Sequence, residues 1–170
     1  IEIQPDFADA HYNLGNTLRD LDKLEEAELS YRKAIEINPN CAEAHFNLGI
    51  ILKDLGKSQE AELSTRKAIK LNPYYANAHS NLGNILRDLG KLEEAEISYR
   101  KAIEINPDYA EAHSNLGNIL RDLGKLQEAQ LSYKKAIEIN PDYVDAHSNL
   151  GLILNDLGKL QEAQLSYKKA

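Results

Sequence analysis

The chain has 170 residues, a formal net charge of −7, no Met, no Trp and a single Cys. An acidic balance argues against nucleic acid or an anionic membrane as the main partner, because both attract a basic face. Cys41 can form no internal disulfide and stands without the further ligands of a zinc site, so we predict no metal or other cofactor and take a cytoplasmic setting as the default.

The strongest signal along the chain is a period of 34 residues. Residues 73–106 and 107–140 share 28 of 34 positions by direct comparison. Self-similarity at a fixed period of this size is the signature of a repeat architecture. The prolines that mark the period are Pro5, Pro39, Pro73, Pro107 and Pro141.

Each repeat is predicted to begin with one amphipathic helix. In the fourth repeat, Asp108 is placed to cap the helix and Glu111 to return the capping bond. Apolar residues such as Leu116 and Leu120 then recur with helical spacing. The helix is predicted to stop at Gly124, because glycine adopts the left-handed conformation that closes a helix end. Asp22 replaces this glycine in the first repeat, and Asp tolerates a positive φ better than most residues.

A second helix is predicted from about Leu126 to Ile139, before the next proline. Its buried stripe includes Ala129, Tyr133 and Ala136. One such hairpin cannot bury both of its faces, so neighbouring repeats must stack on one another.

These positions resemble the tetratricopeptide repeat (TPR) family. The residues that carry the resemblance are Leu116, Gly117, Ala129, Tyr133, Ala136 and Pro141, and they recur in register over nearly the whole chain. The resemblance implies an all-α fold, a right-handed superhelix (α-solenoid) with first helices on its concave side. Counted in the family's way, the segments are the end of a preceding repeat helix at 1–7, repeats at 8–41, 42–75, 76–109 and 110–143, and a truncated fifth repeat at 144–170.

The five histidines are the first candidates for chemistry: His11, His45, His79, His113 and His147. Copies one repeat apart are too distant to share a metal, and catalysis needs different residues converging on one pocket. We therefore favour a core histidine that is hydrogen-bonded within its own repeat over a ligand or a base, and we predict no catalytic site.

An asparagine occupies one position in all five repeats: Asn13, Asn47, Asn81, Asn115 and Asn149. It precedes the buried leucine, so we expect it to point into the groove. A carboxamide can pair with both the C=O and the N–H of a peptide unit. The column is similar to the asparagine ladder in the TPR superhelix of O-linked GlcNAc transferase. The alternative is that the asparagine is simply common at this position and bonds to the neighbouring helix.

Flanking positions complete the candidate peptide-binding set. Three asparagines could widen the polar strip, although Ile50 and Leu152 interrupt it: Asn16, Asn84 and Asn118. A basic row either attracts acidic groups or is neutralised by the aspartate that follows each member: Arg19, Lys53, Arg87 and Arg121. Tyr12 and Phe46, where later repeats have serine, would make an apolar anchor.

The sequence therefore predicts a protein–protein interaction scaffold that binds an extended peptide or protein segment and is not an enzyme. One alternative is the substrate-recruiting arm of a larger transferase, since the chain starts with Ile rather than Met and we expect it to be part of something longer. Another is an amplified or idealised array that associates end to end through uncapped terminal repeats.

Overall fold

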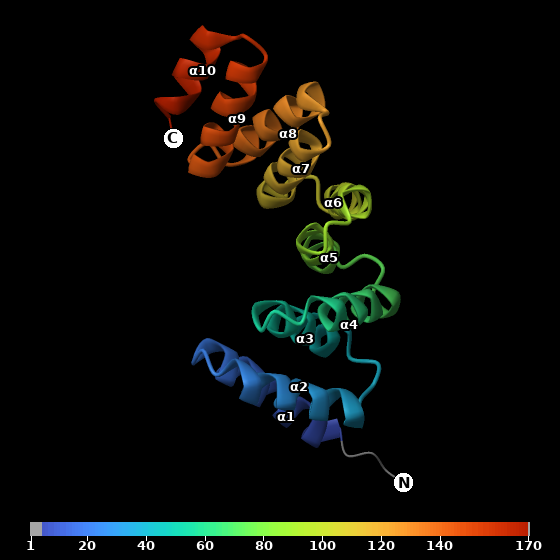
Figure 1. Cartoon of the computed structure of the whole chain (residues 1–170). Helices are drawn as coiled ribbons and strands as arrows, with labels where there is room; N and C mark the ends of the chain where they lie inside the picture. The colour runs from blue at the N-terminus through green and yellow to red at the C-terminus, as the bar shows by residue number, and fades with distance from the viewer. Residues whose placement is uncertain (1–4, 170) are drawn as a thin grey trace. The chain divides into compact units, whose positions relative to one another are not determined.

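The computed structural model describes residues 5–169, with side chains from residue 7 onward. This part of the chain contains ten α-helices in tandem and no strand (Figure 1). The helices are α1 (Pro5–Asp20), α2 (Leu24–Ile37), α3 (Ala42–Asp54), α4 (Ser58–Leu71), α5 (Ala76–Asp88), α6 (Leu92–Ile105), α7 (Ala110–Asp122), α8 (Leu126–Ile139), α9 (Val144–Asp156) and α10 (Leu160–Tyr167). The predicted all-α, α-solenoid fold is thus confirmed.

Two compact units make up the chain, one ending at Leu89 and the other beginning at Gly90. Each helix packs on its neighbours in sequence within each unit. In addition, α3 contacts α5 in the first unit and α7 contacts α9 in the second. The first helices of successive repeats therefore meet on one side of each unit. We call this side the first-helix face, formed by α1, α3 and α5 in the first unit and by α7 and α9 in the second.

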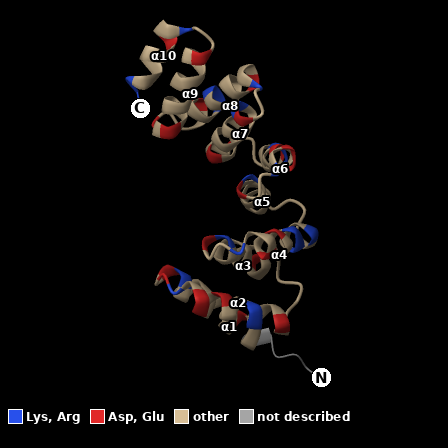
Figure 2. Cartoon of the chain, viewed as in Figure 1, with Lys and Arg blue, Asp and Glu red and all other residues tan. Residues whose placement is uncertain are grey.

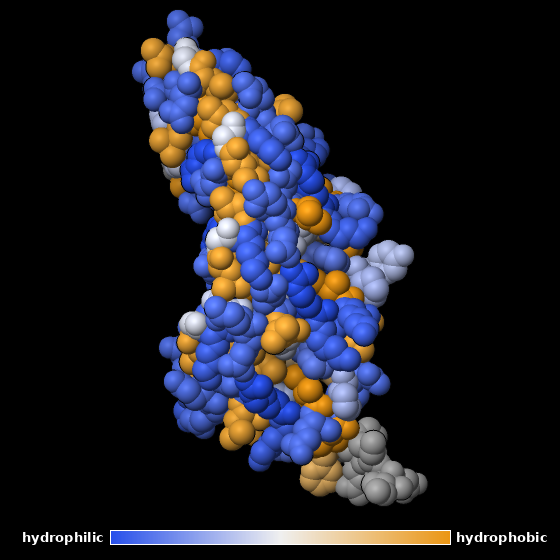
Figure 3. All heavy atoms as spheres, turned by 45° about the vertical axis from the view of Figure 1, so that its right-hand side comes forward, coloured by the Kyte–Doolittle hydropathy of each residue, from blue (hydrophilic) through white to orange (hydrophobic). Residues whose placement is uncertain are grey.

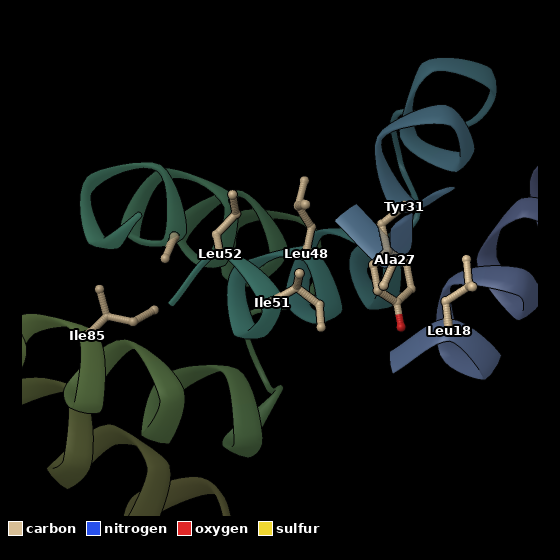
Figure 4. Packing of buried hydrophobic residues seen from close by; sticks show 8 residues of the cluster. Leu18, Ala27, Tyr31, Leu48, Ile51, Leu52 and Ile85 are labelled. Atoms are coloured by element: carbon tan, nitrogen blue, oxygen red, sulfur yellow. The ribbon is translucent and has the colours of Figure 1, made fainter. Parts of the chain in front are cut away.

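The core lies between the stacked helix pairs. In the first unit, Tyr31 from α2 is fully buried between Leu18 of α1 and Leu48 of α3 (Figure 4). Ile51 and Leu52 extend the cluster towards the next repeat. Burying an aromatic ring at the junction of two repeats couples them, because its apolar area leaves water only when both are folded.

A glycine lets the two helices of one repeat approach closely. A Cβ added at Gly117 would lie 2.6 Å from Cε1 of Tyr133, too close for any real carbon contact. Tyr133 is fully buried as a result.

The first helices end as predicted. Gly124 has φ +75° and Asp22 has φ +58°, so both adopt the left-handed conformation. The backbone N–H of Lys125 then donates to the carbonyl oxygen of Leu120 at 2.8 Å, which satisfies a carbonyl at the helix end.

The predicted start of the first helix is wrong. Helix α7 begins at Ala110 with Tyr109 at its N-cap, and no side chain caps it. Asp108 instead lies in the preceding turn, where its backbone N–H donates to Oδ1 of Asn106 at 3.2 Å. The asparagine before the proline thus shapes the turn, as asparagine commonly does by bonding a backbone group two residues on.

The segment at residues 1–7 was predicted to end a preceding repeat helix. Helix α1 begins at Pro5, so residues 5–7 belong to the first helix of the first repeat. Residues 1–4, on which the prediction of a preceding helix rests, lie outside the described residues.

Candidate functional site

A chain of three polar side chains crosses between repeats in the second unit. The hydroxyl of Tyr133 donates to Oδ1 of Asn118 at 2.8 Å. Nδ2 of Asn149, from the next first helix, donates to the same oxygen at 3.2 Å. Burial raises the pKa of Tyr133 to about 12, so the hydroxyl stays protonated and available as a donor. We call this arrangement of Tyr, Asn and next-repeat Asn the relay.

The first unit contains the same relay. The hydroxyl of Tyr31 donates to Oδ1 of Asn16 at 2.8 Å, and Nδ2 of Asn47 donates to that oxygen at 3.0 Å. Nδ2 of Asn47 also lies 3.3 Å from the hydroxyl of Tyr12. Asn47 is only 7% exposed, so its carboxamide is held against the preceding repeat rather than projecting freely.

Repeat two lacks the tyrosine and the first asparagine of the relay. Ile50 stands where Asn16 and Asn118 stand, and Thr65 replaces the tyrosine. Nδ2 of Asn81 then donates to Oγ1 of Thr65 at 3.3 Å. Because the tyrosine and its acceptor are replaced together, neither is left buried without a partner. In the sequence, this difference is visible only when the two positions are compared together, because Ile50 and Thr65 replace the asparagine and the tyrosine in the same repeat.

The remaining asparagines of the column have varied surroundings. Asn13 is exposed, whereas Asn81, Asn115 and Asn149 are half-buried on the first-helix face. Asn84 is half-buried as well. The column is thus partly integrated into the contacts between repeats, and Asn47 and Asn149 take up bonds to a neighbouring helix.

The predicted apolar anchors are both half-buried. The ring of Phe46 packs on Tyr75, with centroids 4.7 Å apart. The ring of Tyr12 lies 6.0 Å from that of Tyr31. Each presents part of its surface on α1 or α3 and uses the rest in packing.

The basic row is paired with the acidic residue that follows each member. Arg19, Arg87 and Arg121 lie 3.2, 3.1 and 3.2 Å from the next aspartate. Lys53 lies 3.9 Å from Asp54 and 4.0 Å from Asp88. Figure 2 shows acidic and basic residues interspersed along both units. Such exposed pairs are worth little in stability, but they reduce the net positive charge that the row offers to a ligand.

Four histidines share one structural contact. Nε2 of His45 lies 3.1 Å from the carbonyl oxygen of Pro39, and His79, His113 and His147 repeat the contact with the proline six residues before. A carbonyl only accepts, so Nε2 carries the proton. Burial, opposed by this bond, lowers the pKa of His45. Counted in the family's way, the bond ties each first helix to the end of the preceding repeat, rather than lying within one repeat as predicted.

An ion-pair network on the second-helix side joins neighbouring repeats, and sequence reasoning missed it. Arg32 bonds Glu28 at 2.9 Å and Glu60 at 2.6 Å, while Lys57 bonds Glu28 at 2.7 Å. Burial raises the pKa of Glu28, but hydrogen bonds from Lys57 and Arg32 outweigh it and hold that pKa below its usual range. The second unit repeats the network around Glu96. Opposite charges 28 and 29 residues apart were the available signal.

Each unit has a groove between two successive second helices. The larger one, of about 490 Å³, has a floor formed by His45, Leu48 and Leu52 and a rim that includes Leu63. The corresponding groove over His113 and α7 has a volume of about 400 Å³. Apolar residues reach the surface in both units (Figure 3). At one position of the repeat, every second helix exposes a large apolar side chain: Leu29, Leu63, Ile97, Leu131 and Leu165.

Among the described helices, none is long and apolar enough to cross a membrane. No group of three His, Cys, Asp or Glu side chains within residues 5–169 is arranged to hold a metal ion.

The fold and the first-helix face define a class of protein, a solenoid of stacked helix hairpins. A TPR repeat family model matches residues 83–120 and 117–158, and tetratricopeptide repeat models match residues 8–41, 30–62 and 65–97. The chain belongs to the tetratricopeptide repeat family. The comparison with curated proteins gave no match.

Several solved structures have a fold similar to that of this chain. A crystal structure of MamA is 28% identical, covers 91% of each chain and superposes with a TM-score of 0.85. YrrB, described as a TPR protein with an unusual peptide-binding site, is 26% identical over 94% of this chain and 82% of its own, with a TM-score of 0.78. TTC0263, a thermophilic TPR protein of Thermus thermophilus, is 26% identical over 96% and 89%, with a TM-score of 0.74.

Proposed function

TPR proteins are protein-interaction scaffolds, and we propose that this chain binds an extended peptide segment along its first-helix face. The observation that supports this best is the row of carboxamides on that face, in which Asn16 and Asn118 keep their amino groups unused by any described residue. Carboxamides pair with peptide backbone, so they favour an extended chain with little regard for its side chains. The similarity to YrrB, a peptide-binding TPR protein, is consistent with this function.

No catalytic step is part of the proposal. Each candidate group recurs along the array, and four of the five histidines contact proline carbonyl oxygens. By analogy with the asparagine ladder of O-linked GlcNAc transferase, the alternative hypothesis is that the chain recruits substrate for a transferase.

The test begins with panning random dodecapeptides on the 170-residue chain. Affinity of a selected peptide is then measured by calorimetry for the parent and for a triple variant, Asn16→Ala, Asn118→Ala and Asn149→Ala. A matched control removes exposed leucines of the second helices, Leu29→Ala, Leu63→Ala and Leu131→Ala. We expect the asparagine variant to lose binding and the leucine variant to keep it. Equal affinity of the asparagine variant and the parent would refute the proposal.

Self-association is a second candidate, for which exposure of α1 is the specific observation. Leu14 is 48% exposed, whereas Leu48, at the same position of the next repeat, is 5% exposed. We propose that in the 170-residue chain a second copy covers this surface. Sedimentation over a range of concentrations tests this, and a mass that stays monomeric at every concentration would exclude it.

A further inference from the structure

The relay occupies the oxygen of one carboxamide and one amino hydrogen of the other. In the second unit, Oδ1 of Asn118 already accepts from Tyr133 and from Asn149. The buried hydroxyl of Tyr133 needs an acceptor for its proton, so the oxygen of Asn118, and not its amino group, must face the tyrosine. The amino group of Asn118 is thereby turned away from these partners, and no described residue accepts from it.

Asn149 has the opposite free end. Its Nδ2 donates to Asn118, and no described residue donates to its Oδ1. Both side chains are half-buried on the first-helix face of the second unit. The pair therefore presents a donor at one end and an acceptor at the other, with the hydrogen bond between them fixing their orientation.

We infer that the peptide-binding element is a split clamp, in which Nδ2 of Asn118 donates to a peptide carbonyl while Oδ1 of Asn149 accepts from a peptide N–H. This inference rests on the proposed function and refines it, because Asn118, whose oxygen already accepts two bonds, cannot supply both contacts. In the first unit Asn16 holds the position of Asn118, but Asn47 is only 7% exposed, so we expect the backbone contact there to come from Nδ2 of Asn16. Tyr133 and Tyr31 are positioning residues that select the orientation of the asparagine without touching the peptide.

The chain itself contains a repeat without the clamp. Ile50 offers no donor, and Asn81 is bonded to Thr65 instead. The first unit is thus expected to hold the peptide backbone at Asn16 and to meet an apolar peptide side chain at half-buried Ile50. Because repeat two folds with this pair of residues, the same exchange is a mild way to remove a clamp elsewhere.

The experiment uses the selected dodecapeptide and a series of its analogues, each with one backbone amide replaced by an ester. An ester removes one N–H donor and weakens the neighbouring carbonyl acceptor. The chain is tested as the parent, as Asn118→Ile with Tyr133→Thr, which copies repeat two, and as the control Asn155→Ala on α9, where the side chain is exposed. The reverse exchange, Ile50→Asn with Thr65→Tyr, adds a clamp.

We expect at least one ester to weaken binding to the parent about tenfold, as for one buried hydrogen bond. In the Asn118→Ile, Tyr133→Thr variant, the same ester should cause no further loss of affinity. In Asn155→Ala, it should weaken binding as much as in the parent. The variant with the added clamp should bind the peptide more tightly than the parent. If the parent binds peptide but every ester costs the same in parent and variant, the split clamp is wrong while the proposed function stands. If the parent selects no peptide, both are wrong.

Discussion

Removing the hydroxyl of Tyr133 should destabilise the second unit by about 1 kcal/mol. Tyr133→Phe keeps the ring that packs on Gly117, so it opens no cavity. It deletes the 2.8 Å bond to Asn118, whose oxygen still accepts from Asn149 and is not orphaned. The loss is then that of one neutral hydrogen bond, about 0.5–1.5 kcal/mol, without the larger penalty of an unpaired buried acceptor.

The chain provides a matched control at Tyr167. This tyrosine occupies the same position of the last repeat and also packs on a glycine, Gly151. Leu152 replaces the relay asparagine there, and Tyr167 is 44% exposed. Tyr167→Phe should therefore change stability by less than about 0.5 kcal/mol.

Urea unfolding followed by circular dichroism measures both variants, with an unchanged m-value as the condition for comparing midpoints. The expected result is a lower midpoint for Tyr133→Phe alone. Equal effects of the two substitutions would refute the role assigned to the relay.

Three further outcomes follow from other contacts. Gln130→Glu should stabilise the last repeat by up to about 1 kcal/mol in thermal unfolding, because Lys159, 3.2 Å from Oε1 of Gln130, would gain an ionic partner. Glu28 has a folded pKa below its reference value of 4.5, so its contribution to stability is present above pH 4.5 and is lost as the pH falls further. Glu28→Gln should therefore flatten the acid limb of a stability–pH curve. Gly117→Ala should cost about 1–3 kcal/mol in urea unfolding despite the better helix propensity of alanine, because its Cβ would collide with Tyr133.

Each of these has its own contradicting outcome. Gln127→Glu is exposed and lies in the same helix as Gln130, so equal stabilisation by both would show a general charge effect. An unchanged acid limb in Glu28→Gln would show that the ion pairs at Glu28 do not stabilise the fold. A stabilised Gly117→Ala variant would show that the two helices move apart freely.

The repeat and its packing could be predicted from the sequence because they depend on local or periodic features. Glycine at the end of the first helix is required by backbone sterics at one residue, and the Gly117–Tyr133 contact recurs with the period. The prediction of where the first helix begins was wrong for a physical reason. Asp108 has the chemistry of a cap, but Asn106 takes its backbone N–H into a turn first, and α7 starts two residues later.

The candidate site was predictable in position but not in chemistry. The column of asparagines marks the first-helix face, yet which end of Asn47 is occupied depends on Asn16 and Tyr12, thirty-one and thirty-five residues away. The ion pairs of Glu28 likewise join residues of different repeats. Such contacts follow from the offset between stacked repeats, and no single repeat's sequence contains that offset.

The most direct measurement is an NMR titration of the parent chain with the selected dodecapeptide, observing the side-chain amide protons of asparagine. Peptide bound on the first-helix face should shift the amino protons of Asn16 and Asn118 more than other side-chain amides and leave the methyl groups of Leu63 and Leu131 unchanged. Shifts confined to those leucines, with the asparagine amino protons unmoved, would place the peptide in the grooves beside the second helices and contradict the account.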